Sequence, residues 1–468
     1  MSHMTEQALI EQLRLMVGET GVLTGPDVSE RFTNTVNPQP LVCQCLVRPH
    51  STQQISQVLA LCNREGQAVV PQGGLTGLVQ GADATPSEVA LSLERMNRIE
   101  KVDPVQRVLV AQAGVKLEVA QQAAAAVGLM LPIDLGARGT ATLGGLVSTN
   151  AGGNRVLRYG MTRDSVLGLE AVLADGTVLT SMNELIKNNS GYDLKHLFIG
   201  SEGTLGIVTR VVFRLVEALP GRQMALLALP DFDAVPHLLR LFEQTAPGAL
   251  TAFEAMWPAF YELVTSPPAI SRPPLVHGHA LYVMVEVSTD ARHGTSVLEQ
   301  ALSDAFEQGW VTDAMLTQTE RDCLALWEMR DDVAQMGRFG PPCGYDISVP
   351  LQATHTYVTQ VSQHIWQRWP DAQIWAFGHL GDGNVHLVVS VPGLTAADHH
   401  LLDRMVYDPL GPLGGAVSAE HGIGLEKRAW LTVSRSPAEL ALMGVLKRSL
   451  DPKGTLNPGR VLMDSSLC

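Results

Sequence analysis

Two histidines and a carboxylate form the most specific chemical pattern in the sequence. His379 and His386 flank the turn-forming residues Asp382-Gly383-Asn384, with apolar residues before and after. Such a turn predicts two tightly joined strands whose imidazoles can face one point. Further along, Glu420 and His421 supply a carboxylate and a third imidazole. Two imidazoles and one carboxylate suit a catalytic divalent ion, Zn²⁺ above all, with Mn²⁺, Fe²⁺ or Co²⁺ as further options. The alternative is a set of hydrogen-bonded core histidines, the commoner fate of an isolated histidine.

A glycine-rich loop, Pro71 to Gly81 (PQGGLTGLVQG), follows a short apolar strand. Glycines let successive backbone N–H groups converge on an anion such as phosphate. The chain contains neither the G-x-G-x-x-G dinucleotide fingerprint nor a Walker A loop. Taken alone, a loop of this kind is more often an ordinary turn.

Further glycine clusters follow at residues 132–136, 142–145, 149–153 and 200–207. Helix N-termini and glycine loops both bind phosphate through the backbone. Several such regions in one half of the chain therefore predict a long ligand with more than one phosphate.

Strands and helices alternate up to about residue 215, which favours an α/β or α+β unit. We expect a helix over residues 5–17 and another that opens with a capping box between Ser51 and Gln54. The clearest strand candidates in this part are residues 41–47, 108–111, 172–173 and 207–213.

Beyond residue 218 glycine becomes sparse and proline pairs appear, so we place a domain boundary there. Strand candidates follow at residues 224–229, 280–287, 373–377 and 385–391. A last helix is predicted to begin after Ser436, with Glu439 completing its cap.

The chain has 468 residues and a net charge of −14, which argues against nucleic acid or anionic lipid as a partner. No apolar run reaches the ~18 residues that span a bilayer, so no transmembrane segment is expected. Six scattered cysteines and no visible signal peptide predict reduced thiols and a cytoplasmic protein. The oligomeric state is left open, with a homodimer as one option.

In order and spacing, the motifs P-x-G-G-x-T-G, P-I-D, T-x-G-G, T-N-A-G-G and G-S-E-G-T-L-G-I resemble the FAD-binding domain of vanillyl-alcohol oxidase-type flavoproteins. Within that class the chain is similar to the D-lactate and D-2-hydroxyglutarate dehydrogenase branch. The resemblance implies an α+β fold: a two-subdomain FAD-binding domain, an α+β substrate (cap) domain with an antiparallel sheet, and a C-terminal helical segment that returns to the flavin. We therefore expect an N-terminal helical segment at 1–40, the FAD-binding domain at 41–217, the cap domain at 218–417 and the C-terminal segment at 418–468.

The resemblance also implies which residues bind FAD. The pyrophosphate would lie on Gly73 to Gly77, the flavin near residues 142–153, and the adenine and ribose near Gly203 to Ile207. Neither His nor Cys occurs in residues 71–81 or 132–153, so we expect FAD to be bound non-covalently. The cofactor-binding residues carried over are Pro71, Gly73, Gly74, Leu75, Thr76, Gly77, Pro132, Asp134, Thr142, Gly144, Gly145, Thr149, Asn150, Gly152, Gly153, Gly203, Thr204, Ile207 and Asn457.

By the same likeness, G-H-x-G-D-G-N-x-H and S-x-E-H-G-x-G are metal and active-site motifs. The implied metal ligands are His379, His386 and Glu420. His421 would contact the substrate and act as its acid/base catalyst.

Arg330 stands where the family has an arginine for the substrate carboxylate, and a planar guanidinium suits that task. A salt bridge on a helix surface is the alternative. We expect Asn384 to shape the metal loop and to bind the substrate.

The chain departs from the hydroxyglutarate pattern at three positions where that pattern has polar groups. They are occupied here by Ala334, Cys343-Gly344 and Val388. A buried distal carboxylate without partners would cost several kcal/mol, so we expect a small or apolar side chain on the substrate. Arg338 or Arg321 could still reach a diacid from another direction.

The resemblance thus implies FAD- and metal-dependent oxidation of a D-2-hydroxy acid to the 2-oxo acid, with hydride passing to flavin N5. Electrons would then go to an acceptor other than oxygen, such as an electron-transfer flavoprotein, a quinone or a cytochrome. Three alternatives stay open: D-2-hydroxyglutarate dehydrogenase proper, an oxidase of the same fold, and a non-catalytic flavin subunit that relays electrons.

Overall fold

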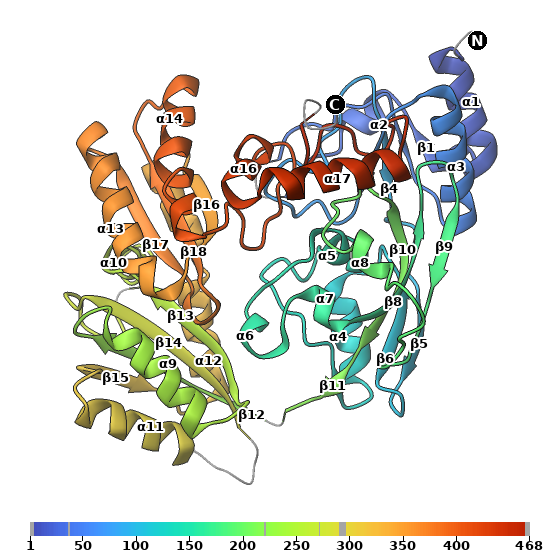
Figure 1. Cartoon of the computed structure of the whole chain (residues 1–468). Helices are drawn as coiled ribbons and strands as arrows, with labels where there is room; N and C mark the ends of the chain where they lie inside the picture. Colours follow the sequence, from blue (N-terminus) through green and yellow to red (C-terminus); the bar gives the residue numbers. More distant parts are fainter. Residues whose placement is uncertain (1–3, 36–37, 220, 271, 290–295, 464–468) are drawn as a thin grey trace. The chain divides into compact units, whose positions relative to one another are not determined.

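The structure, a computed structural model, describes residues 4–35, 38–219, 221–270, 272–289 and 296–463 (Figure 1). The chain forms two compact units. The first comprises Met1–Gly153, Gly160–Ala218 and Glu420–Cys468, and the second comprises Asn154–Tyr159 and Leu219–Ala419. The chain thus enters the main part of the second unit after Ala218.

The N-terminal part of the first unit is a small sheet in the order β1-β2-β4-β3, with β2, β4 and β3 parallel. The predicted N-terminal helix is confirmed as α1, which Thr5 caps. The predicted strand at 41–47 is too long, because the Leu41 N–H donates back to the Arg31 carbonyl instead of joining the sheet. The elements are α1 (Glu6–Val17), β1 (Val22–Leu23), α2 (Pro26–Ser29), β2 (Cys45–Val47), α3 (Thr52–Glu65), β3 (Val69–Gln72) and β4 (Val89–Ser92).

The cap of α3 differs from its prediction in one partner. The Ser51 side chain accepts from the Gln54 N–H as expected, but the Gln54 side chain accepts from the His50 N–H. None of the five cysteines that the structure describes forms a disulfide, and Cys468 lies outside the described residues.

The rest of the first unit is built on an antiparallel sheet in the order β5-β6-β10-β8-β9. Its core is apolar and includes Leu109, Leu169 and Phe213. The elements are β5 (Ile99–Asp103), β6 (Val108–Gln112), α4 (Leu117–Ala125), β7 (Leu129–Met130), α5 (Leu143–Thr149), α7 (Thr162–Ser165), β8 (Val166–Val172), β9 (Val178–Ser181), α8 (Lys195–Phe198), β10 (Ile207–Arg214) and β11 (Val216–Glu217).

The C-terminal segment of the first unit contains α16 (Leu431–Ser434) and α17 (Pro437–Leu450). The predicted capping box of Ser436 and Glu439 at the start of α17 is confirmed. The buried side chain of α17 is a charged one: Lys447 donates to the carbonyls of Thr204 and Leu456 and pairs with Asp451. This helix is therefore fixed to the glycine-rich region at residues 200–207 by polar contacts.

The second unit is a seven-stranded antiparallel sheet in the order β15-β12-β14-β13-β17-β18-β16 (Figure 1). All four strands predicted beyond residue 218 are confirmed. The strands are β12 (Gly221–Leu229), β13 (Leu250–Met256), β14 (Leu281–Thr289), β15 (Asp313–Leu316), β16 (Cys343–Ser348), β17 (Gln373–His379) and β18 (Asn384–Ser390).

Helices cover both faces of this sheet, and each face has its own apolar cluster. The helices α10 (Pro258–Val264) and α12 (Glu320–Arg330) and the 3₁₀ helix Val333–Phe339 pack on one face. On the other face pack α9 (Ala234–Thr245) and α11 (Ser296–Glu307). The remaining helices of this unit are α6 (Val156–Tyr159), α13 (Leu351–Arg368), α14 (Ala396–Tyr407) and α15 (Leu410–Leu413).

Candidate active site

Four polar side chains lie on one face of the seven-stranded sheet, the face covered by α10 and α12, which we call the site face. Glu254 on β13 pairs in register with His379 on β17. His386 on β18 pairs with Asp346 on β16 and with Phe377 on β17. Directly paired residues of adjacent strands point to the same face, as do residues two apart along one strand. Strand order and register therefore bring residues distant in sequence into two adjacent rows of one face, Glu254 with His379 in one and His386 with Asp346 in the next.

The hairpin between β17 and β18 positions the two histidines. Its turn is the predicted one: the Asp382 carboxylate accepts from the Asn384 N–H at 3.3 Å, and Gly383 takes the left-handed conformation with a φ of 84°. The ring centroids of His379 and His386 are 5.5 Å apart, and the ring planes are inclined by 81°. The hairpin thus brings the two imidazoles together as the sequence predicted.

Glu254 is the buried carboxylate of this face, with an exposed fraction of 1%. Its Oε1 accepts from His379 Nδ1 at 2.5 Å, and its Oε2 accepts from Arg330 Nε at 2.9 Å. Burial by itself raises the pKa of this carboxyl, but His379 and Arg330 lower it to about 2. The sequence analysis missed Glu254. The available signal was the one charged residue within the otherwise uncharged, mostly apolar stretch Leu250–Met256.

Arg330 is the last residue of α12 and is buried on the site face. Besides its bonds to Glu254, its Nη1 pairs with Asp331 at 3.2 Å, and its guanidinium carbon lies 5.2 Å from the centre of the Phe377 ring. The salt bridge on a helix surface that the sequence offered as an alternative is therefore not what forms, because the side chain is enclosed. Its contact with a substrate carboxylate stays a prediction.

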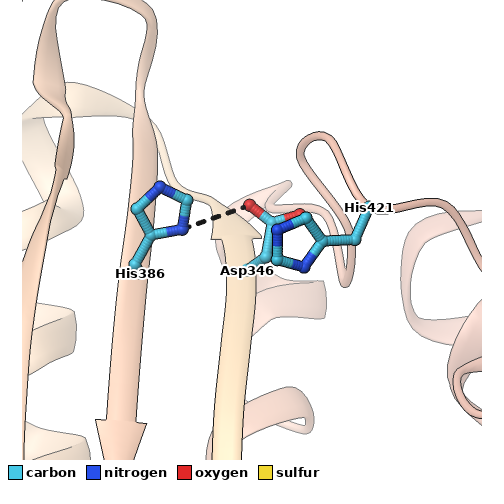
Figure 2. A group of neighbouring side chains, drawn as sticks. All are labelled: Asp346, His386 and His421. Atoms are coloured by element: carbon cyan, nitrogen blue, oxygen red, sulfur yellow. Dashed lines mark ion pairs between the residues drawn. The ribbon is translucent and has the colours of Figure 1, made fainter. Parts of the chain in front are cut away.

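Asp346, which the sequence analysis did not select, is fully buried beside His386 (Figure 2). Its Oδ1 lies 3.6 Å from His386 Nδ1, the pair joined by the dashed line in Figure 2. The side chain of Asn384 donates to the same Oδ1 at 2.8 Å and to the Ile347 carbonyl at 3.1 Å. The Ala419 N–H donates to the other carboxylate oxygen at 3.2 Å. Asn384 thus joins β18 to β16 through Asp346 and Ile347, and its roles in the metal loop and in substrate binding stay predictions.

In the first unit, the glycine-rich loops lie against one another. A Cβ atom at Gly73 would lie 2.7 Å from the Thr142 hydroxyl, and one at Gly203 would lie 2.6 Å from the ring of Pro71. Thr142 caps α5 through the Gly145 N–H. A Cβ atom at Gly73 or Gly203 would therefore force the side chain that faces it to shift, which favours glycine at both positions.

The segment Glu420–Gly424 returns to these loops within the first unit. A Cβ atom at Gly152 would lie 2.5 Å from Glu420 Oε1. The Glu202 carboxylate accepts from the N–H groups of Ile423 and Gly424 at 2.7 and 2.8 Å. Glu202 was not predicted as a site residue, although it lies within the glycine cluster at residues 200–207. The half-buried His421 lies in the chain between Glu420, which faces Gly152, and Ile423, whose N–H is bonded to Glu202.

The other residues assigned to the cofactor also lie in the first unit. Asn457 donates through its side chain to the carbonyls of Gly81 and Glu202. Asn150 has a positive φ of 50° and accepts from the Arg163 N–H. The residues of this set are Pro71, Gly73, Gly74, Leu75, Thr76, Gly77, Pro132, Asp134, Thr142, Gly144, Gly145, Thr149, Asn150, Gly152, Gly153, Gly203, Thr204, Ile207 and Asn457.

Comparison with known proteins agrees with this arrangement. Residues 43–181 match the FAD binding domain family, and residues 220–461 match the family described as FAD linked oxidases, C-terminal domain. The chain belongs to the FAD-linked oxidases. It is therefore an FAD-dependent oxidoreductase, as the resemblance predicted.

Curated relatives extend over most of this chain. It is 38% identical to a D-2-hydroxyglutarate dehydrogenase of Xanthomonas citri, with 93% of this chain and 91% of the relative covered. A relative from Stutzerimonas stutzeri has the same name and is 34% identical, with 98% of this chain and 99% of the relative covered. A mitochondrial relative from Bos taurus is 40% identical over 89% of this chain and 76% of its own length.

Solved structures with low identity show the same fold. A p-cresol methylhydroxylase with substrate bound aligns with a TM-score of 0.75 at 16% identity, covering 98% of this chain and 97% of that one. An alkyldihydroxyacetonephosphate synthase aligns with a TM-score of 0.73 at 16% identity, covering 98% of this chain and 88% of that one. The predicted fold class, an α+β flavoprotein of the vanillyl-alcohol oxidase type, is confirmed. Among the described residues, no helix is long and apolar enough to cross a membrane.

The glycine loops offer groups that suit FAD. Within the described part of the chain, the backbone N–H groups of residues 73–77 donate to no other group. Asn457 Oδ1 is buried and has no hydrogen-bond partner there. A run of available donors on a glycine loop suits a pyrophosphate, and a buried acceptor suits a polar edge of a cofactor.

Proposed function

We propose that this protein oxidises a D-2-hydroxy acid to the 2-oxo acid and passes the electrons from FAD to an acceptor other than oxygen, such as an electron-transfer flavoprotein, a quinone or a cytochrome. The observation that carries the proposal is the site face, where the histidine pair and Arg330 lie within one buried polar network. The names of the relatives support the same substrate class.

In this reaction Arg330 binds the substrate carboxylate, because a guanidinium matches a carboxylate in shape and charge. His421 accepts the proton of the 2-hydroxyl as general base. FAD, when bound, would supply the two-electron acceptor for the hydride that leaves the substrate Cα. The substrate thus loses one hydride and one proton and becomes the 2-oxo acid.

We further propose that His379, His386 and Glu420 hold a divalent metal, Zn²⁺ above all. The support lies in the donor set: the Nδ1 of His379 bonds to Glu254, which leaves Nε2 as the ligating nitrogen. Glu420 directly follows Ala419, whose N–H is bonded to Asp346 in the second unit. Such a metal would supply a Lewis acid beside the substrate hydroxyl.

We propose a substrate with a small or apolar side chain. On the site face, Asp346, His386 and Phe377 are paired across three strands and form one row. The adjacent row consists of Gly344, Val388 and Trp375. Val388 and Trp375 belong to a buried apolar cluster. This row offers no side-chain partner to a distal carboxylate. The other candidate is D-2-hydroxyglutarate itself, which the names of the relatives favour.

An anaerobic absorbance titration of the purified protein with D- and L-2-hydroxy acids tests the function, before and after EDTA. We expect one class of D-acid to bleach the flavin band, EDTA to abolish the bleaching, and Zn²⁺ or Mn²⁺ to restore it. Flavin that no hydroxy acid reduces would refute the proposal and favour an electron-relay subunit. Fast reoxidation of the reduced flavin by air would favour an oxidase instead.

A further inference from the structure

One carboxylate on the site face serves two groups that the proposed reaction uses separately. Glu254 Oε1 accepts a hydrogen bond from the predicted metal ligand His379. Glu254 Oε2 accepts one from the predicted substrate-binding residue Arg330. All three residues belong to the second unit and are at least nine-tenths buried. The carboxylate is therefore positioned to orient both.

Each bond has a definite structural consequence. A carboxylate that accepts from Nδ1 fixes the ring orientation and the tautomer of a metal-ligating histidine, so that Nε2 faces the metal. A carboxylate paired with the Nε side of a guanidinium fixes the plane of that group. Because β13 and β17 hold Glu254 and His379 in register, the ladder itself determines the first of these bonds.

We propose that Glu254 is a positioning residue that orients His379 toward the metal and Arg330 toward the substrate carboxylate, so that both affinities depend on this one side chain. The inference rests on the proposed function. It adds a residue that neither the motifs nor the family resemblance assigned. Glu254 itself contacts neither the metal nor the substrate in this scheme.

The rival explanation is that Glu254 only anchors α12 to the sheet. A second buried carboxylate allows the two explanations to be separated. Glu286 on β14 lies on the same face and accepts from Trp327 Nε1 of α12 at 2.9 Å, while on the sheet it accepts from Arg222 and Thr251. Glu286 therefore anchors the same helix, and its side chain has no bond to His379.

The experiment compares Glu254→Gln with Glu286→Gln in the full FAD-loaded chain. Each protein is stripped of metal, and its dissociation constant for Zn²⁺ and for Mn²⁺ is measured by competition with a chromogenic chelator. We expect Glu254→Gln to weaken metal binding by roughly 10–100-fold, the range found for such hydrogen-bond partners. Glu286→Gln should keep the wild-type constant even if its Tm falls.

A second readout addresses Arg330. We expect Glu254→Gln, saturated with metal, to raise KM for the D-2-hydroxy acid more than it lowers kcat. If Glu254→Gln does not fold, Glu254→Asp is measured against the same criteria, because it keeps the charge but shortens its reach.

Wild-type metal affinity and KM in the Glu254 variant would overturn the inference, and so would a loss of metal affinity that Glu286→Gln reproduces. A wild-type protein without a metal site would overturn it as well. Failure of the proposed function has a different signature, because the wild-type flavin would then resist reduction by every D-2-hydroxy acid.

Discussion

Glu420 lies directly against Gly152: a Cβ atom at residue 152 would be 2.5 Å from Glu420 Oε1 and 3.1 Å from its Cγ. No real Cβ contact is that short, so any side chain at position 152 must displace this carboxylate. The proposed metal ligand thus depends on a glycine in the loop assigned to the flavin.

Gly152→Ala is therefore expected to weaken metal binding by at least about tenfold, in line with the loss of an orienting contact. Chelator competition on the metal-stripped protein measures the change. Gly139→Ala is the matched control, because its added Cβ would find its nearest neighbour at an ordinary 3.5 Å. An unchanged metal affinity in Gly152→Ala would argue against Glu420 as a ligand.

Gly74→Ala is expected to reduce FAD retention. A Cβ atom there would lie 2.2 Å from the Thr140 carbonyl oxygen, and backbone cannot move aside as a flexible side chain can. The loop that offers its N–H groups to the pyrophosphate would have to shift. The ratio of flavin to protein absorbance after gel filtration reports occupancy. Gly136→Ala, which adds a methyl group with nothing within 4 Å, should keep its flavin.

Val388→Asn is expected to shift the substrate preference toward a diacid. Val388 lies two residues from His386 on the site face and is 7% exposed, so an amide there gives a distal carboxylate a donor. We expect the ratio of kcat/KM for D-2-hydroxyglutarate over that for D-lactate to rise at least about tenfold. Val388→Ala removes volume without adding a donor and should leave the ratio low. A wild-type enzyme that already prefers the five-carbon diacid would contradict the apolar-pocket proposal.

Lys447→Met is expected to destabilise the first unit. The ammonium group donates to the carbonyls of Thr204 and Leu456 and pairs with the buried Asp451, whose charge would be left uncompensated. Losing one partner of a buried pair costs about 3–5 kcal/mol of the free energy of unfolding. Chemical denaturation measures this cost, and Lys453→Met is an exposed control. A cost below about 1 kcal/mol would show that the cluster is solvated.

The same lysine gives a pH dependence. Burial lowers the pKa of Lys447 below its usual 10.5, although Asp451 opposes the shift. As the pH approaches 10.5, Lys447 therefore binds fewer protons in the folded state than in the unfolded state. Its contribution to the free energy of unfolding rises with pH in this range, and this contribution is lost as the pH drops through the folded-state pKa. The difference in stability between wild type and Lys447→Met should widen as the pH rises from neutral. A constant difference would contradict the shifted pKa.

The sequence by itself determined the features that local chemistry controls. The turn at Asp382-Gly383-Asn384, the cap of α17 and the glycine loops each depend on residues close together in the chain, where hydrogen bonding and permitted φ angles decide the conformation. Family likeness supplied the cofactor and the fold class. The same local reasoning failed at Leu41, because a contact with Arg31 outside the strand pattern decided its conformation.

Only the tertiary structure decided that Glu254 meets His379 and Arg330, and that Asp346 meets His386. Glu254 and His379 stand on strands that are far apart in the sequence. Their contact depends on the strand order β13-β17-β18-β16 and on the pairing register between β13 and β17. A slip of one residue in that register would turn every side chain of the strand to the opposite face. The strand order and the register cannot be read from the spacing of residues in the sequence. Both are determined by the burial of the two apolar faces of the whole sheet.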